Sequence, residues 1–231
     1  MKRLIAGLVA VPLLLSAPAW AEDAVALDTM EQRFSYLIGL QLANGMMEQG
    51  IDKDLDIAAF SQALKDTFAG TEPRLSQEQI QETVQAMQAK AMQEEAEKGA
   101  AALAAGQAFL AENKTKDGVE TTESGLQYSV TEAGSGAKPA ASDTVKVHYE
   151  GRLLDGTVFD SSYNRGEPAT FGVSQVIAGW QEALQMMPAG AKWEVWIPSD
   201  LAYGPTGAGG AIGPNEVLNF TIELIEITDS K

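Results

Sequence analysis

Residues 147–180 read VHYEGRLLDGTVFDSSYNRGEPATFGVSQVIAGW, and this stretch decides the fold of the second half of the chain. Val147 and Tyr149 alternate with polar residues and Asp155-Gly156 supplies a tight turn, which together predict a β-hairpin. From Ile177 onward the spacing of the apolar residues becomes helical. Aromatic and acidic side chains are denser here than an ordinary strand pair needs, which indicates a binding pocket built largely from one segment.

The N-terminus predicts export. Lys2-Arg3 precedes an apolar run over residues 4–15, and small residues follow at Ala19 and Ala21, which is typical of a secretory signal peptide over residues 1–21. A membrane anchor is the alternative, but the run is shorter than the about 20 residues that a spanning helix needs. We expect a periplasmic protein, with association with the outer membrane or the cell surface as the alternative.

Composition excludes several classes of function. The chain of 231 residues has no cysteine, which excludes disulfides, thiol catalysis and cysteine-ligated metal. Its net charge of −16 becomes more negative once the cationic leader is removed, and such a surface repels nucleic acid and anionic membranes. We therefore expect no nucleic-acid partner, no membrane span in the mature chain, and no metal or other cofactor.

Residues 22–117 are predicted to be helical. Apolar side chains recur at helical spacing over residues 28–47 and 57–68, which predicts two short amphipathic helices. A third helix begins with a capping box at Ser76 and is predicted to run to about Asn113. Because one long polar helix cannot bury two short ones, we expect the short helices to form a homodimer with a second copy of the chain. A monomeric helical bundle with a solvated spacer is the alternative.

After Gly118 the helical periodicity gives way to alternation, which predicts a second domain over residues 118–231. The predicted strands lie near residues 126–130, 144–154, 193–197 and 218–224. Residues 177–187 form the only clear helix of this half, and a single helix has to cover the apolar face of the sheet, so the fold class is α+β. The Gly-, Ala- and Pro-rich segment between Tyr203 and Pro214 is expected to be a loop over a cleft.

Four segments carry a specific resemblance. They are VHYEGRLLDGTVFDSS, VIAGWQEAL, IPSDLAYG and VLNFTIELIEI, which begin at residues 147, 176, 197 and 217. In order and spacing they closely resemble the FK506-binding protein (FKBP) family of peptidyl-prolyl cis-trans isomerases, over about residues 118–228. The leading half, with YLIGLQLANGMMEQG at residues 36–50 and the long helix, resembles the N-terminal dimerisation region of the macrophage infectivity potentiator and FkpA-like branch.

The resemblance implies a half-wrapped antiparallel sheet around one short helix, with an apolar pocket at the end of that helix. Four residues are expected to act on the substrate, namely Asp160, Tyr203, Ile177 and Tyr149. Six more are expected to bind the proline and its surroundings: Phe159, Phe171, Val176, Trp180, Ile212 and Phe220. Among these, Trp180 is expected to form the floor of the pocket. The backbone N–H of Ile177 and the hydroxyl of Tyr203 are expected to donate hydrogen bonds to substrate carbonyls.

The chain departs from the family's commonest pattern at three positions, Ala169, Ala208 and Ala211. We expect a shallower rim there, which bears on the binding of FK506-like macrolides more than on catalysis. Asp155 is explained by its turn rather than as half of a hydrolytic carboxylate pair. His148 points away from Tyr149 in an alternating strand and is expected to be structural or on the surface.

The activity that the resemblance implies is rotation about X-Pro bonds in unfolded or partly folded exported proteins, which assists their folding. The alternative is a non-catalytic dimeric chaperone that binds unfolded exported proteins in the cleft between its arms.

Overall fold

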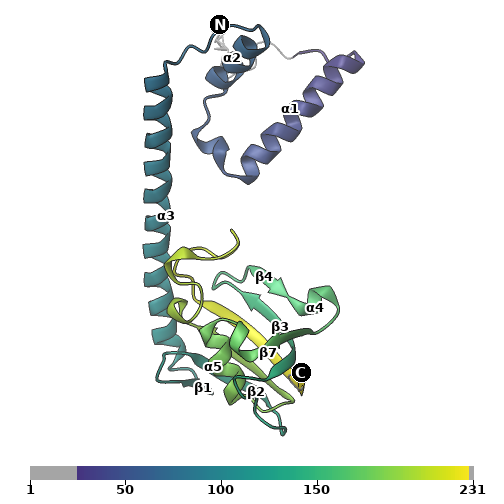
Figure 1. Ribbon diagram of the computed structural model, residues 1–231, viewed down its shortest axis with the longest axis vertical. Helices are drawn as coiled ribbons and strands as arrows, with labels where there is room; N and C mark the ends of the chain where they lie inside the picture. Colours follow the sequence, from purple (N-terminus) through teal and green to yellow (C-terminus); the bar gives the residue numbers. More distant parts are fainter. Residues whose placement is uncertain (1–24, 229–231) are drawn as a thin grey trace, which may run out of the picture. The chain divides into compact units, whose positions relative to one another are not determined.

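The computed structural model describes residues 25–228, so the predicted signal peptide lies outside the described residues. The chain divides into two compact units, one that ends at Ser76 and one that begins at Gln77. Figure 1 labels the helices and strands of both. Of the helices described between residues 25 and 228, none is long and apolar enough to cross a membrane.

The first unit contains helices α1 (Met30–Glu48) and α2 (Ile57–Phe68), joined through the short 3-10 helix η1 (Ile51–Asp54). Thr29 caps α1 in a capping box, because its Oγ1 accepts from the backbone N–H of Gln32 while its own N–H donates to Gln32 Oε1. Neither helix buries a residue, and Phe34 of α1 is 62% exposed. The unit therefore has amphipathic helices without a core of its own.

The second unit begins with helix α3 (Gln77–Asn113), which is 37 residues long. Its only buried residues are Gly99, Gly106 and Asn113, which recur every seven residues and so share one face. A Cβ atom on Gly106 would lie 2.6 Å from Cγ2 of Val217, and the Asn113 side chain donates a 3.0 Å hydrogen bond to Gln127. The C-terminal half of α3 is therefore packed on the sheet domain and is more than a solvated spacer.

The sheet has seven strands in the order β1-β2-β6-β7-β3-β4, with β5 pairing β3, and all pairings are antiparallel. The strands are β1 (Val119–Thr121), β2 (Gln127–Ala133), β3 (Thr144–Arg152), β4 (Val158–Ser161), β5 (Ala169–Gly172), β6 (Ala191–Ile197) and β7 (Leu218–Thr228). Short helical turns fill the connections: α4 (Ser162–Arg165), η2 (Val173–Gln175), η3 (Ser199–Leu201) and η4 (Gly204–Thr206). This architecture confirms the predicted α+β class.

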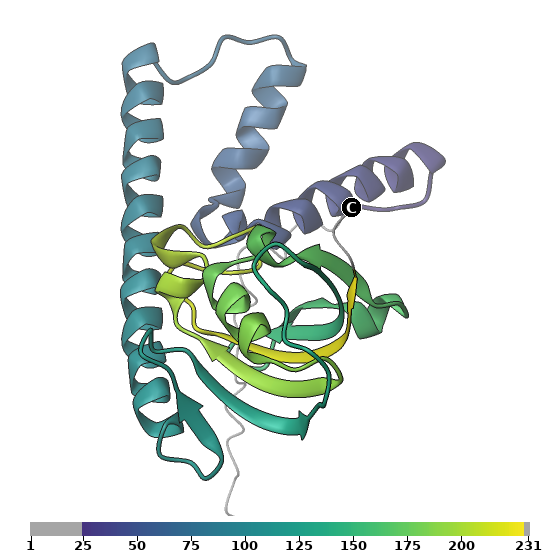
Figure 2. The same ribbon diagram turned by 60° about the horizontal axis from the view of Figure 1, so that its bottom comes forward.

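Helix α5 (Ala178–Met186) lies in the curve of the sheet, as the green helix in Figure 2 shows. It buries Trp180, Ala183 and Leu184 against the inward side chains of the central strands. Gly179 allows the close approach, because a Cβ atom there would lie 2.4 Å from Cγ2 of Ile197. The start of α5 is thereby fixed at the edge of the pocket described below.

Candidate active site

The pocket lies at the N-terminal end of α5 and has a volume of about 350 Å³. Nine of the ten residues expected from the sequence line it, namely Tyr149, Phe159, Asp160, Phe171, Val176, Ile177, Trp180, Tyr203 and Phe220. Gln175 also lines it and was not predicted. The pocket thus gathers side chains from four strands, one helix and two loops.

Ile212 is the predicted residue that does not line the pocket. It forms an isolated antiparallel bridge with Ala208, with backbone hydrogen bonds of 2.9 and 3.0 Å in the two directions. This bridge places the Ile212 side chain in the hydrophobic core, where it is buried. The same core cluster contains Tyr149, Trp180 and Phe220, which do line the pocket, so a role of Ile212 in substrate binding stays a prediction.

Trp180 lies at the centre of the aromatic residues and is 4% exposed. Its indole meets three other rings nearly at right angles, those of Tyr149, Phe171 and Phe220, with centroid distances of 5.3, 5.8 and 5.2 Å. Edge-to-face contacts of this kind are favourable because the positive edge of one ring meets the negative face of the next. The rings therefore hold one another in place.

Gly151 in β3 explains how two of these rings come together. The rings of Phe159 and Phe220 meet edge to face at 5.5 Å. A Cβ atom on Gly151 would lie 2.5 Å from Cζ of Phe159 and 2.7 Å from Cε1 of Phe220, so a side chain there would displace both. A glycine within a strand normally weakens the strand, and here, near the end of β3, it makes room for the pocket wall.

The one carboxylate in the pocket wall is held by two partners. Oδ2 of Asp160 accepts a 2.5 Å hydrogen bond from the Tyr149 hydroxyl, and Oδ1 accepts one of 2.5 Å from Nη1 of Arg165. Nη2 of Arg165 also donates to the Tyr149 hydroxyl oxygen at 2.9 Å, and the guanidinium lies 5.4 Å from the centre of the Tyr149 ring. The three side chains form a closed polar triangle beside the aromatic rings.

Arg165 was not predicted as a site residue. It is the last residue of α4, a single helical turn that starts directly after β4 and is capped by the Ser161 hydroxyl, which accepts from the backbone N–H of Asn164. This turn brings Arg165 back beside Asp160. The only signal in the sequence is a cation five residues after the carboxylate, which is too weak to identify a partner.

The pKa values of Tyr149 and Asp160 are shifted in opposite directions. Burial, assisted by the hydrogen bond to Asp160, raises the pKa of Tyr149 above its ordinary value. Burial also acts most strongly on Asp160, in the upward direction, but the hydrogen bonds from Tyr149 and Arg165 and the charge of Arg165 together outweigh it and lower the pKa of that carboxyl. At neutral pH the site therefore holds an ionised carboxylate and a neutral phenol.

Two potential donors at the mouth of the pocket have no partner of their own. Ile177 is the N-cap residue directly before α5, and within residues 25–228 no hydrogen bond engages its backbone N–H. The hydroxyl of Tyr203, a residue that is 40% exposed, is also without a hydrogen bond in the described part of the chain. Both groups are available to a carbonyl oxygen of a bound peptide.

Asp155 and His148 lie away from the pocket, as predicted. Oδ1 of Asp155 accepts a 2.8 Å hydrogen bond from the backbone N–H of Thr157, which stabilises the hairpin turn. His148 stacks on Tyr163 with a centroid distance of 4.7 Å, and its Nδ1 lies 3.0 Å from the Ser162 hydroxyl. Across the described residues, no group of three His, Cys, Asp or Glu side chains is arranged to hold a metal ion.

Two family models match the chain. Residues 135–225 match the FKBP-type peptidyl-prolyl cis-trans isomerase domain, and residues 31–130 match the domain amino terminal to FKBP-type peptidyl-prolyl isomerase. In the crystal structure of FkpA from Escherichia coli, the whole of that chain superposes on 89% of this one, with a TM-score of 0.70 and 35% sequence identity.

Curated relatives match along nearly their whole length. The outer membrane protein MIP of Legionella longbeachae is 46% identical over 98% of both chains. The peptidyl-prolyl cis-trans isomerase Mip of Coxiella burnetii is 43% identical, over 98% of this chain and 99% of its own. The FKBP-type 22 kDa isomerase of Escherichia coli is 45% identical, over 87% of this chain and 97% of its own. The chain therefore belongs to the family of FKBP-type peptidyl-prolyl cis-trans isomerases.

Proposed function

We propose that this isomerase rotates X-Pro bonds inside the pocket around Trp180 and that its substrates are proline-containing, unfolded or partly folded exported proteins. The observation that carries the assignment of the site is the enclosure of one ionised carboxylate, Asp160, among aromatic rings beside two unpaired donors. This combination suits a reaction that breaks no σ bond and needs only tighter binding of the twisted amide than of the planar one.

The physical task is to lower a barrier of about 18 to 20 kcal/mol, which arises because amide resonance is lost as the X-Pro bond turns. Each tenfold acceleration requires that the twisted state be bound about 1.4 kcal/mol more tightly than the planar one. The charge separation of the twisted amide is smaller than that of the planar amide. An apolar pocket therefore stabilises the twisted amide relative to the planar one more than water does. The rings of Tyr149, Phe159 and Phe220 supply that enclosure around the proline.

Asp160 acts through its charge rather than as a nucleophile. Both of its oxygens accept hydrogen bonds, one from Tyr149 and the other from Arg165, so neither is aimed at a substrate atom as a free base. Once a bound peptide displaces water from the pocket, a fixed charge at its wall interacts more strongly with the turning carbonyl dipole than it does in water. Asp160 thereby polarises the surroundings of the bond and orients Tyr149.

Ile177 and Tyr203 fix the peptide while the bond turns. The N–H of Ile177 stands at the start of α5, and the Tyr203 hydroxyl lies on the opposite loop. Two donors to two substrate carbonyls hold the chain on both sides of the proline, so that rotation is confined to the X-Pro bond. FK506-like macrolides are expected to compete for the same pocket, although the small side chains of Ala169, Ala208 and Ala211 give them less to contact at the rim.

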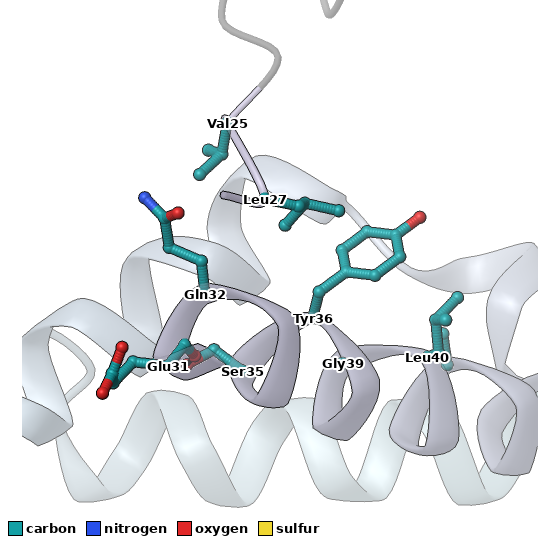
Figure 3. Close-up of a pocket in the computed structure, with 9 residues that line it drawn as sticks. Val25, Leu27, Glu31, Gln32, Ser35, Tyr36, Gly39 and Leu40 are labelled. Atoms are coloured by element: carbon teal, nitrogen blue, oxygen red, sulfur yellow. Dashed lines mark hydrogen bonds between the residues drawn. The ribbon is translucent and has the colours of Figure 1, made fainter. Parts of the chain in front are cut away.

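The first unit is proposed to form a homodimer through α1. A groove of about 660 Å³ runs along this helix, and Figure 3 shows Leu27, Tyr36 and Leu40 as sticks along it. The helix leaves Phe34, Leu37 and Leu42 exposed as well, and helices that lack a core normally obtain one by association. We propose that α1 of a second copy of the chain fills this groove, because it is an equally apolar helix. Two isomerase domains in one particle can then engage one client together.

The chain is proposed to act in the periplasm, where it assists the folding of exported proteins. The leader-like sequence over residues 1–21 supports export, and so does the relative named outer membrane protein MIP. Cell fractionation with an antibody to the mature chain checks the compartment, and recovery in the cytoplasmic fraction contradicts it.

The experiment that tests the site compares X-Pro exchange rates of the wild type and of Tyr203→Phe by NMR. Removing the hydroxyl is expected to lower kcat/KM several-fold, because a donated hydrogen bond is worth about 0.5 to 1.5 kcal/mol. The melting temperature is expected to stay close to that of the wild type, because the hydroxyl makes no bond within the described residues. An unchanged rate refutes the role of Tyr203.

A further inference from the structure

Asn215 connects the long helix to the loop that carries Tyr203. Its side-chain Nδ2 donates a 3.1 Å hydrogen bond to the backbone carbonyl of Gly99 in α3. Its backbone N–H donates one of 2.8 Å to the carbonyl of Gly204, the residue that follows Tyr203. A single residue is therefore bonded to the helix on one side and to the neighbour of a pocket residue on the other.

The backbone of Asn215 is itself unusual. Its φ angle is 59°, and among the described residues it is the only one other than glycine with a positive φ. Asparagine tolerates this left-handed conformation better than most residues, and such a conformation persists only where the surroundings enforce it. The two hydrogen bonds of Asn215 hold the residue in this conformation between α3 and the loop.

The helix approaches this loop closely because it presents glycine. A Cβ atom on Gly99 would lie 2.9 Å from Cβ of Pro214 and 3.3 Å from Nδ2 of Asn215. A side chain there would therefore push the loop away and lengthen the bond to the Gly99 carbonyl. Two turns further on, Gly106 meets Val217 in the same manner. The segment 214–217 is thus held against α3 at both of its ends.

Tyr203 depends on its backbone for its position. Its hydroxyl has no hydrogen bond within the described residues, and its side chain is partly exposed at the pocket. The next residue, Gly204, begins the short helix η4 with a φ angle of 57°. The bond from Asn215 to the Gly204 carbonyl therefore holds the peptide unit between Gly204 and Pro205, one residue beyond Tyr203.

We propose that Asn215 is a positioning residue of the isomerase reaction, which fixes Tyr203 through Gly204 and makes the docked half of α3 part of the apparatus that binds the substrate. This inference rests on the role proposed above for Tyr203. Because Tyr203 holds a substrate carbonyl in both the planar and the twisted states, a displaced Tyr203 weakens binding of both. The loss therefore falls on KM rather than on kcat.

The test uses the full chain with Asn215→Asp. This change keeps the size of the side chain and its tolerance of positive φ, but it replaces the donor to the Gly99 carbonyl by an acceptor. We expect KM for an X-Pro peptide to rise about fivefold, as for the loss of one hydrogen bond, with kcat nearly unchanged. Asn215→Gly, which adopts the same φ and adds no charge, is expected to raise KM as well. A merely structural defect lowers kcat by reducing the folded fraction and leaves KM unchanged.

A double-mutant cycle with Tyr203→Phe separates the possible outcomes. If Asn215 acts through Tyr203, Asn215→Asp raises KM in the wild type and has little further effect in Tyr203→Phe. Equal effects in both backgrounds overturn the inference. If Tyr203→Phe raises KM but neither Asn215 variant does, the inference fails while the proposed function stands. If Tyr203→Phe leaves KM and kcat unchanged, the role of Tyr203 fails and the inference fails with it.

The matched control is Asn113→Asp. Like Asn215→Asp, it replaces an asparagine by an aspartate. Asn113 lies on the same face of α3 as Gly99, and the change breaks its hydrogen bond to Gln127, two heptads away from the contact with Asn215. It is expected to lower thermal stability with KM unchanged. An increase in KM equal to that of Asn215→Asp attributes the effect to general loosening of α3 and overturns the inference.

Discussion

The hydroxyl of Tyr149 lies 2.5 Å from Oδ2 of Asp160 and donates a hydrogen bond to it. The other carboxylate oxygen is bonded to Arg165, so the charge of Asp160 is fixed at the pocket wall from two directions. The hydrogen bond between these two residues has two effects. It keeps the carboxylate ionised, and it holds one of the aromatic rings on which the shape of the pocket depends.

Replacing the carboxylate by its amide isostere tests whether the charge matters. Asp160→Asn is expected to lower kcat/KM by about tenfold, which corresponds to about 1.4 kcal/mol of lost stabilisation of the twisted state. Little stability should be lost, because the Asp160 side chain is 44% exposed and its ion pair is screened by solvent. The control is Asp155→Asn in the hairpin turn, whose rate should match the wild type. Equal rates for all three proteins would remove Asp160 from the mechanism.

The pH dependence of the rate follows from the same pair. The pKa of Asp160 is lowered from its ordinary 3.8, since the bonds from Tyr149 and Arg165 outweigh the opposing and larger single effect of burial, and the pKa of Tyr149 is raised. Stability that depends on the ionised carboxylate is therefore present above its unfolded pKa and is lost as pH falls through the folded pKa. The rate is expected to be level between about pH 5 and pH 9.

Arg165→Gln checks this explanation. Without the guanidinium, Asp160 loses one hydrogen bond and the favourable charge, so its pKa rises and the acid limb of the rate profile moves to higher pH. The wild type and the variant are compared by measuring kcat/KM from pH 3 upward, a range set by the ordinary carboxyl pKa of about 4. An acid limb at the same pH in both proteins contradicts the assignment of Arg165.

The contact between α3 and the sheet domain predicts that replacing Gly106 by alanine lowers stability, which is the opposite of the effect of this change in a free helix. In a free helix Gly→Ala stabilises by up to about 1 kcal/mol. Gly106→Ala is instead expected to destabilise the domain by about 1 to 3 kcal/mol, since the new methyl group would collide with Val217. Urea unfolding measures the difference. The double variant Gly106→Ala/Val217→Ala should recover part of the loss, and a stabilised Gly106→Ala would show that the helix is not docked in solution.

The proposed dimer is tested by placing a charge in the groove of α1. Leu40 lines that groove, and Leu40→Glu is expected to convert a dimer into a monomer, because an unpaired carboxylate is costly in an apolar interface. Light scattering coupled to size exclusion measures the mass. Met92→Glu, at an exposed position of α3, is the matched control and should remain dimeric. A wild type that is already monomeric contradicts the proposal.

Most of the pocket could be predicted from sequence through the resemblance to the FKBP family, and the alternation along two strands is consistent with that prediction. Tyr149 follows the inward positions of β3, and Phe220 follows those of β7. The same alternation fixed the direction of His148 toward the other face, where it stacks on Tyr163. Side chains alternate between the two faces of a strand, so the positions of the strand and its turns determine on which side of the sheet each ring lies.

The rest depended on contacts that no local pattern encodes. Arg165 reaches Asp160 only because a single helical turn follows β4. Gly99 and Gly106 read as weak points in a helix, whereas they are the places where another segment of the chain approaches. Packing partners distant in sequence decide such positions, and propensity carries no information about them.

NMR exchange spectroscopy on an X-Pro peptide measures directly whether this chain catalyses rotation about X-Pro bonds. The peptide is mixed with substoichiometric amounts of the full mature chain, and the rate of exchange between the cis and trans signals is measured. Uncatalysed exchange takes tens of seconds or longer, so it is invisible on the timescale of the experiment. We predict that exchange becomes measurable and increases in proportion to the protein concentration. Exchange as slow with the protein as without it would contradict the isomerase activity.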